Sequence, residues 1–156
     1  MKSNSMGGFM HEEIELKGEN FSLLIIILGY ENTNASELSD ASWLTCEIKL
    51  EISGLLYINQ VSFLTDDFIY FSNAITQLFL STGEFKLNLF DSYEEYLMFN
   101  ATKTHLGKIQ IDGKIKNNNM PSINLEFTFN TDNGLLLETK KQLRNFLARL
   151  DSPDVA

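Results

Sequence analysis

WLTCEIKLEI, residues 43–52, is the stretch that decides how this chain folds. Side chains alternate between the two sides of an extended strand, so a strict apolar–polar alternation predicts a half-buried β-strand. The apolar face of this stretch holds Leu44, Cys46, Ile48, Leu50 and Ile52. Ser53-Gly54 then predicts a hairpin turn, and residues 55–64 the returning strand.

Further strands are expected on both sides of this hairpin. Residues 21–28, FSLLIIIL, are so hydrophobic that they predict a buried central strand without a solvated face. Downstream, four more segments have strand-like patterns, and they are residues 85–89, 96–102, 109–116 and 123–129.

Two stretches have helical periodicity instead. In residues 65–80 one apolar stripe is predicted, and Thr65 or Asp66 is expected to cap the first free amides. Residues 132–150 form the second predicted helix, with a stripe that includes Leu143 and Phe146.

The predicted order of elements is β-β-β-α-β-β-β-β-α. Strands joined by short turns are antiparallel, because parallel pairs need longer crossover connections. We therefore expect an α+β fold in which an antiparallel β-sheet has two α-helices packed on one face. The predicted organisation is a flexible tail at residues 1–10 and a single α+β domain at residues 11–151.

Composition narrows the choice of partners. The chain has 156 residues and a formal net charge of −9, which argues against direct binding to nucleic acid. This charge is compatible with a basic protein partner, and the same charge also simply keeps a protein soluble. The single cysteine cannot form an intrachain disulfide, and no apolar run follows Lys2 as in a signal peptide, so a cytoplasmic location is expected. The longest apolar run, residues 23–28, is far shorter than the ~20 residues that span a bilayer, so no membrane association is expected.

Little in the sequence points to catalysis. His11 and His105 lack neighbouring His or Cys residues at metal-ligand spacing, and Cys46 lies on the apolar face of its strand. An acid-catalysed reaction would need two carboxylates that converge in a cleft, and no spacing here implies such convergence. We therefore expect no enzymatic activity, no catalytic residues, no metal site and no cofactor.

Two groups of acidic residues and one aromatic residue remain as candidates for binding. One acidic group lies within residues 31–40, and the other within residues 91–95. Each group is either solvated loop charge or an acidic patch that binds a partner. Trp43 falls on the polar side of its strand, so it either lies under the preceding loop or is an exposed aromatic anchor.

Two short stretches together resemble a known family. Residues 40–48, DASWLTCEI, have an Asp and a Trp-Leu pair before an alternating strand, and Leu125-Glu126-Phe127 is followed by Thr131-Asp132 and a terminal helix. This combination resembles small bacterial proteins of the WapI-type immunity family. The order of elements fits over roughly residues 14–150.

The resemblance implies a protein that neutralises a cognate toxin domain by direct contact. The toxin, often a nuclease, would have a basic cleft, and an acidic immunity protein would cover that cleft or a neighbouring surface. The family defines no catalytic residues, so the implied contact residues are the exposed candidates. They are Glu31, Glu37, Asp40, Trp43, Asp91, Glu94 and Glu95.

Three alternatives to the immunity hypothesis remain open at this stage. A curved sheet under two helices can enclose an apolar pocket, which would make the chain a carrier of a small apolar ligand. A scaffold role is the second alternative, since the hydrophobic segment at residues 23–28 needs either burial or a partner strand. An acid-based enzyme is the third. The sequence does not indicate the oligomeric state, the strand order or the toxin.

Overall fold

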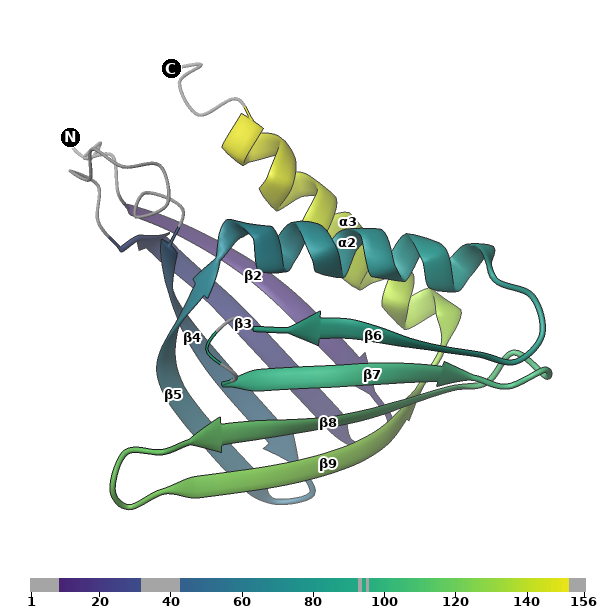
Figure 1. Cartoon of the computed structure of the whole chain (residues 1–156), viewed down its shortest axis with the longest axis horizontal. Coiled ribbons are helices and arrows are strands. Elements are labelled where there is room, and N and C mark those ends of the chain that lie inside the picture. The colour runs from purple at the N-terminus through teal and green to yellow at the C-terminus, as the bar shows by residue number, and fades with distance from the viewer. Residues whose placement is uncertain (1–8, 32–42, 93, 95, 152–156) are drawn as a thin grey trace.

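The computed structural model describes residues 9–31, 43–92, 94 and 96–151. Eight strands and two helices follow one another in these residues (Figure 1). In chain order they are β2 (Phe9–Gly18), β3 (Phe21–Tyr30), β4 (Trp43–Ile52), β5 (Leu55–Leu64), α2 (Thr65–Leu80), β6 (Phe85–Asp91), β7 (Leu97–Lys103), β8 (Ile109–Asn117), β9 (Ile123–Thr131) and α3 (Asn133–Asp151). The predicted α+β class with antiparallel strands is confirmed.

The strands divide between two sheets, where the sequence predicted one. The first sheet has the order β2-β3-β4-β5, and the second has the order β6-β7-β8-β9. Every neighbouring pair in both sheets is antiparallel. The first sheet also contains a strand that the predicted order lacks. This strand, β2, begins at Phe9, inside the segment expected to be a tail.

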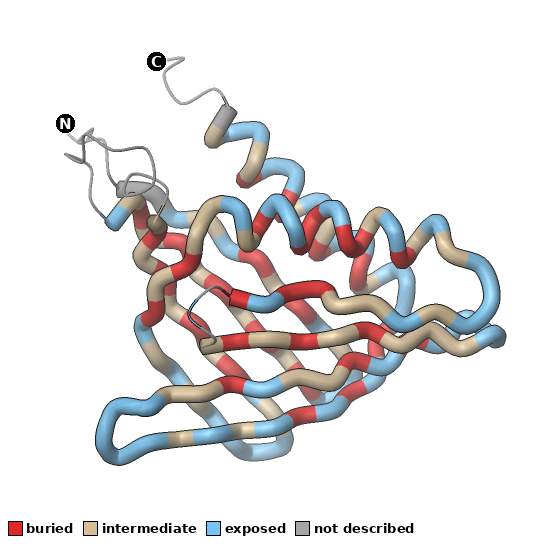
Figure 2. Tube along the Cα trace, viewed as in Figure 1, coloured by how far each residue is buried: buried red, intermediate tan, exposed pale blue. Residues whose placement is uncertain are grey.

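The two sheets face each other, and the core lies between them. Buried positions alternate along the strands, as in β3, where every second residue is buried (Figure 2). At the centre, phenylalanines from both sheets and both helices contact one another. The ring centroids of Phe63 and Phe90 are 5.1 Å apart, and those of Phe68 and Phe146 are 5.4 Å apart. Edge-to-face contacts of this kind join the four parts into one core.

The sheets come together at one corner through a second aromatic contact. Phe21 of β3 stacks on Phe129 of β9, with ring centroids 3.6 Å apart. Beside it, the Glu19 N–H donates a hydrogen bond to the carbonyl of Asn130 at 3.1 Å. Gly18 permits this approach, because a Cβ atom there would collide with Phe129 and with the Asn130 carbonyl.

The hydrophobic strand β3 occupies an interior position in its sheet, as expected, but it does not lack a solvent-side face. Leu24, Ile26 and Leu28 are only half-buried, on the side of the sheet that faces away from the second sheet. Leu24 lies between Glu15 and Lys49, and Ile26 between Glu13 and Glu47. Long charged side chains can cover such apolar positions along their aliphatic stems.

Both helices lie together on one side of the molecule, with α2 along β6 and α3 along β2 (Figure 1). The predicted apolar stripes face the core, since Phe68, Phe71 and Ile75 in α2 and Leu143 and Phe146 in α3 are buried. The predicted cap of α2 was wrong in detail. Leu64 occupies the N-cap position, and its N–H bonds to the Asp67 carboxylate at 2.9 Å.

Helix α3 closes the outer edge of β2. The side chain of Gln142 accepts a hydrogen bond from the Glu15 N–H, and the Thr139 hydroxyl donates one to the Glu15 carbonyl, both at 2.7 Å. An ion pair of 2.7 Å between Arg149 and Glu12 attaches the last turn of the helix to the same strand. These bonds satisfy backbone groups that an edge strand otherwise leaves open. No helix in the described part of the chain is long and apolar enough to cross a membrane.

Candidate functional site

One end of the first sheet brings several elements together. Strand β3 ends there, β4 begins there, and β5 passes there into α2. The Glu31 N–H donates a hydrogen bond to the carbonyl of Trp43 at 2.8 Å. On the other side of β4, Trp43 is paired with Leu64 of β5. The β6–β7 connection lies on the same side of the molecule (Figure 1). The contact between Phe63 and Phe90 accounts for this, because it joins the last residues of β5 to those of β6.

Five carboxylates are carried by these elements. We call this region the acidic end, and it consists of Glu31, Asp66, Asp67, Asp91 and Glu94. Glu31, Asp66, Asp91 and Glu94 are exposed. Asp67 is half-buried because it caps α2, and acidic residues in the first turn also suit the positive end of the helix dipole.

Two of these acidic residues affect the pKa of the same tyrosine. Burial raises the pKa of Tyr96, and a hydrogen bond to Glu94 and the charges of Glu94 and Glu31 raise it further. Glu31, at the end of β3, and Glu94, before β7, therefore influence the same hydroxyl. Their charges come from distant parts of the sequence and are concentrated at one end of the fold.

The acidic side chains are held in different ways. The Ser62 hydroxyl donates a hydrogen bond to the Glu31 carboxylate at 2.5 Å, which fixes that side chain against β5. Among the described residues, the ion pairs are His11–Glu13, Lys141–Glu138 and Arg149–Glu12. None of these pairs neutralises Glu31, Asp91 or Glu94, so their charges are available to an external cation.

The predicted contact residues have different outcomes. Glu31, Asp91 and Glu94 are exposed at the acidic end, whereas Glu37, Asp40 and Glu95 lie outside the described residues. Trp43 is half-buried at the start of β4, and the loop that was expected to cover it also lies outside the described residues.

Sequence reasoning missed three contributors to this region. Asp66, Asp67 and Ser62 lie here because β5 runs antiparallel to β4 and ends beside Trp43. The missing signal was strand register. Ser62 is opposite Thr45, two residues along the strand from the Trp43–Leu64 pair.

The structure also places the cysteine and the two histidines that the sequence offered for chemistry. Cys46 is fully buried, and its pKa is raised by burial and, to a smaller extent, by the charge of Asp67. A reactive thiol needs the opposite, a lowered pKa at an accessible site. His11 and His105 are exposed, and no group of three or more potential metal ligands occurs in the part of the chain that the structure describes.

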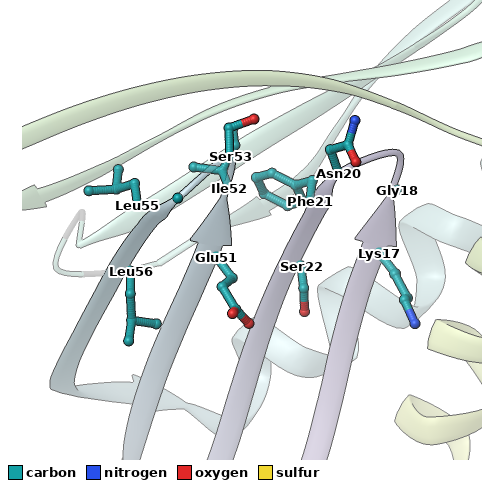
Figure 3. Close-up of a pocket in the computed structure, with 11 residues that line it drawn as sticks. Lys17, Gly18, Asn20, Phe21, Ser22, Glu51, Ile52, Ser53, Leu55 and Leu56 are labelled. Carbon is teal, nitrogen blue, oxygen red and sulfur yellow. The ribbon is translucent and has the colours of Figure 1, made fainter.

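A surface hollow bears on the alternative of a ligand carrier. It has a volume of about 490 Å³ and lies at the turn ends of β2–β3 and β4–β5 (Figure 3). Its lining includes exposed residues such as Lys17, Asn20 and Leu55, so it is open to solvent. The phenylalanine contacts described above occupy part of the interior between the sheets.

Comparison with known protein families gives a match over most of the chain. The family model described as "Immunity protein WapI-like family" matches residues 14–151. The matched range begins in β2 and ends with α3, so it includes both sheets and both helices. No curated protein and no solved structure matches the chain.

Proposed function

Because the chain belongs to the WapI-like immunity protein family, we propose that it binds a cognate toxin domain and neutralises it by direct contact. The acidic end is the surface that makes the contact. The partner is a toxin domain with a basic surface, and the chain acts in the cytoplasm without catalysing a reaction itself.

The observation that carries this proposal is the gathering of carboxylates at one end, where Glu31, Asp91 and Glu94 take no part in the ion pairs of the described residues. Glu31 follows a strand of the first sheet, Glu94 lies between two strands of the second, and both act on Tyr96. Opposite charges on two proteins accelerate their association and disfavour partners of the wrong charge. A cluster of this kind is suited to a cationic cleft such as the substrate site of a nuclease.

Half-buried aromatic groups beside the carboxylates supply the apolar part of such an interface. Trp43 and Tyr96 are half-buried at this end, next to Glu31 and Glu94 respectively. Trp and Tyr are enriched among the residues that contribute most to binding energy, and a surrounding polar rim provides specificity. The acidic end contains both kinds of residue.

The first experiment is a growth-rescue assay with the toxin domain encoded next to this chain. The domain is expressed alone and then together with the chain, and the two proteins are purified together. We expect toxicity alone, rescue on co-expression and a stable complex. Toxicity that the chain leaves unchanged, without a complex, would contradict the proposed function.

The acidic end is tested by charge reversal with a matched control. The test variant combines Glu31→Lys with Glu94→Lys, and the control combines Glu84→Lys with Glu126→Lys at exposed positions elsewhere. Each substitution changes −1 to +1, so both double variants alter the net charge equally. We expect the test variant to weaken toxin binding by at least about tenfold, or about 1.4 kcal/mol, with little effect in the control.

Calorimetry at two salt concentrations completes this test. Binding of the unmodified chain should weaken as salt rises, because salt screens exposed charges, and the test variant should lose this dependence. Equal weakening in the test and control variants would show that overall charge matters and that the acidic end is not the contact surface.

A further inference from the structure

The two sheets have four edge strands, and three of them are protected. Helix α3 covers β2 through Thr139 and Gln142, as described above. Helix α2 packs along β6, which also carries Lys86 and a register shift between Asn88 and Phe90. Strand β9 carries Glu126, and its Asn130 carbonyl is bonded to Glu19. Covering elements, bulges and charges are the usual means by which proteins prevent strands from pairing at an open edge.

The fourth edge, β5, has none of these protections within the described residues. Its sequence, LLYINQVSFL, contains no charged residue and no proline. It pairs with β4 without any register shift from Leu55 to Leu64. In the described part of the chain, no backbone hydrogen bond joins it to a strand other than β4. A long, regular and uncharged edge is a template for another strand.

Apolar side chains are exposed along the first half of this edge. Leu55, Leu56 and Ile58 are 45%, 54% and 50% exposed. Figure 3 shows Leu56 on the same side of the sheet as Glu51, and Leu55 on the opposite side. Ile58 lies on the side of Leu56, since residues two apart share a face. Together with the half-buried Leu24 and Ile26, these residues give the outer face of the first sheet an apolar centre that reaches the open edge.

A hydrogen bond near the far end of β5 shows which way its backbone groups point. The Trp43 carbonyl bonds to Glu31 on the β3 side, so the pair Trp43–Leu64 is not hydrogen-bonded across β4 and β5. Leu64 therefore points its backbone groups away from β4. Because these directions alternate along a strand, Ile58 and Leu56 also offer their N–H and C=O groups at the open edge.

We propose that β5 pairs in antiparallel orientation with β5 of a second copy of this chain, about a two-fold axis at Ile58. Ile58 then lies opposite Ile58 of the second copy, and each donates its N–H to the carbonyl of the other. Leu56 lies opposite Gln60 of the second copy. The two four-stranded sheets become one continuous sheet with its apolar outer face extended across the axis.

Charge favours a second copy as the occupant of this edge. A neutral strand has no charge with which to select a basic toxin domain, whereas it can pair with itself without repulsion. The overlap, residues 55–61, also stops before the acidic end, where β5 passes into α2. This inference is independent of the proposed function, because it concerns the isolated chain.

The first test measures the mass of the full chain by sedimentation over a wide concentration range. We expect association to a dimer of twice the 17.8 kDa of one chain. Ile58→Lys should shift the protein to monomer, and the control Leu106→Lys, at a residue 75% exposed in the β7–β8 connection, should leave the dimer intact. Circular dichroism checks that both variants are folded. A monomeric wild-type chain at all concentrations, or an unchanged dimer with Ile58→Lys, would overturn the proposal.

A second test uses disulfide cross-linking, so it does not require the folded chain to tolerate a lysine at position 58. Directly opposite residues in a hydrogen-bonded antiparallel pair have Cα atoms about 5.5 Å apart, within the range of a disulfide. Ile58→Cys should therefore form a disulfide-linked dimer under mild oxidation, while Leu106→Cys should form much less; the native Cys46 is buried. Equal cross-linking at the two positions, or none at Ile58→Cys, would overturn the proposal. The proposal would also be overturned if the chain is monomeric and Ile58→Lys weakens toxin binding, because the β5 edge would then be a contact surface for the toxin.

Discussion

Gly113, in the middle of β8, is a residue where the packing leaves no room for a side chain. A Cβ atom at this position would lie 2.6 Å from the Phe127 ring and 2.7 Å from both the Met98 carbonyl oxygen and the Phe99 Cβ. Two of the obstructing atoms belong to a neighbouring strand's backbone or to the base of its side chain. They cannot move without displacing β7, so glycine is required here for space and not for an unusual backbone conformation.

We predict that Gly113→Ala lowers the free energy of unfolding by about 1–3 kcal/mol, the usual cost of overpacking a core. Urea denaturation followed by circular dichroism measures this. Lys114→Ala, at the adjacent exposed position, is the control and should change stability by less than about 0.5 kcal/mol. If Gly113→Ala leaves the free energy of unfolding unchanged, β7 and β8 separate more easily than their packing indicates.

The buried thiol of Cys46 links stability to pH. In the unfolded chain a thiol ionises near its ordinary pKa of about 8.5, whereas burial in the folded protein raises the pKa of Cys46. The unfolded chain therefore releases this proton at lower pH than the folded protein does. It follows that ionisation of the thiol does not affect stability below about pH 8.5 and that it lowers the free energy of unfolding as pH rises above this value.

We predict that the decline between about pH 8.5 and 9.5 is shallower in Cys46→Ala than in the wild-type chain. Urea denaturation at several pH values gives the two slopes. The comparison uses slopes because the cavity left by Cys46→Ala lowers stability at every pH. The raised pKa values of Tyr30 and Tyr96 act in the same direction at higher pH and are common to both proteins. Parallel slopes would contradict the prediction.

At the scale of elements, the contact between α3 and β2 rests on side chains that bond to backbone groups. The Thr139 hydroxyl donates to the Glu15 carbonyl at 2.7 Å, and Thr139 itself is fully buried. Removing the hydroxyl leaves the half-buried Glu15 carbonyl without this partner at a strand edge. Such a loss costs more than the net value of one hydrogen bond, because the helix hinders water from replacing the hydroxyl.

We predict that Thr139→Val lowers the free energy of unfolding by about 1–3 kcal/mol. Thr76→Val in α2 is the matched control, because the Thr76 hydroxyl bonds only to the carbonyl of Ser72 one turn earlier in the same helix. Hydrogen exchange at the Glu15 amide should also become faster in Thr139→Val, since the helix that covers this strand is held less firmly. Equal effects of the two substitutions would show that the contact between α3 and β2 does not depend on this bond.

At the scale of the whole molecule, local patterns were predictable and long-range placement was not. The bounds of β4, β5 and α2 were predicted as the structure has them. Strand β4 and helix α2 have a clear apolar face, and β5 lies between the Ser53-Gly54 turn and the start of α2. Strand β2 was missed because its pattern is broken by a charge. Glu12 lies opposite Ile27 on the core side, and its charge is balanced only by Arg149 from the far end of the chain.

The division into two sheets and the position of the candidate site could not be predicted, for the same reason. Alternation shows which face of a strand is buried, but it does not show which strand lies beside it. Glu31, Asp91 and Glu94 were selected correctly as exposed acids. Their convergence depends on the register of β4 with β5 and on the aromatic contacts between the sheets, such as Phe63 with Phe90. Neither is visible in a single sequence.

The closure of β2 by α3 has a consequence for synthesis on the ribosome. Of the described elements, strand β2 is translated first and the helix that covers its edge is translated last. While the nascent chain grows, the first sheet can form, but its β2 edge has no partner until Thr139 and Gln142 have emerged. During that interval the open edge is exposed to neighbouring nascent chains, which makes translation of the last helix the step that ends the risk of misassembly.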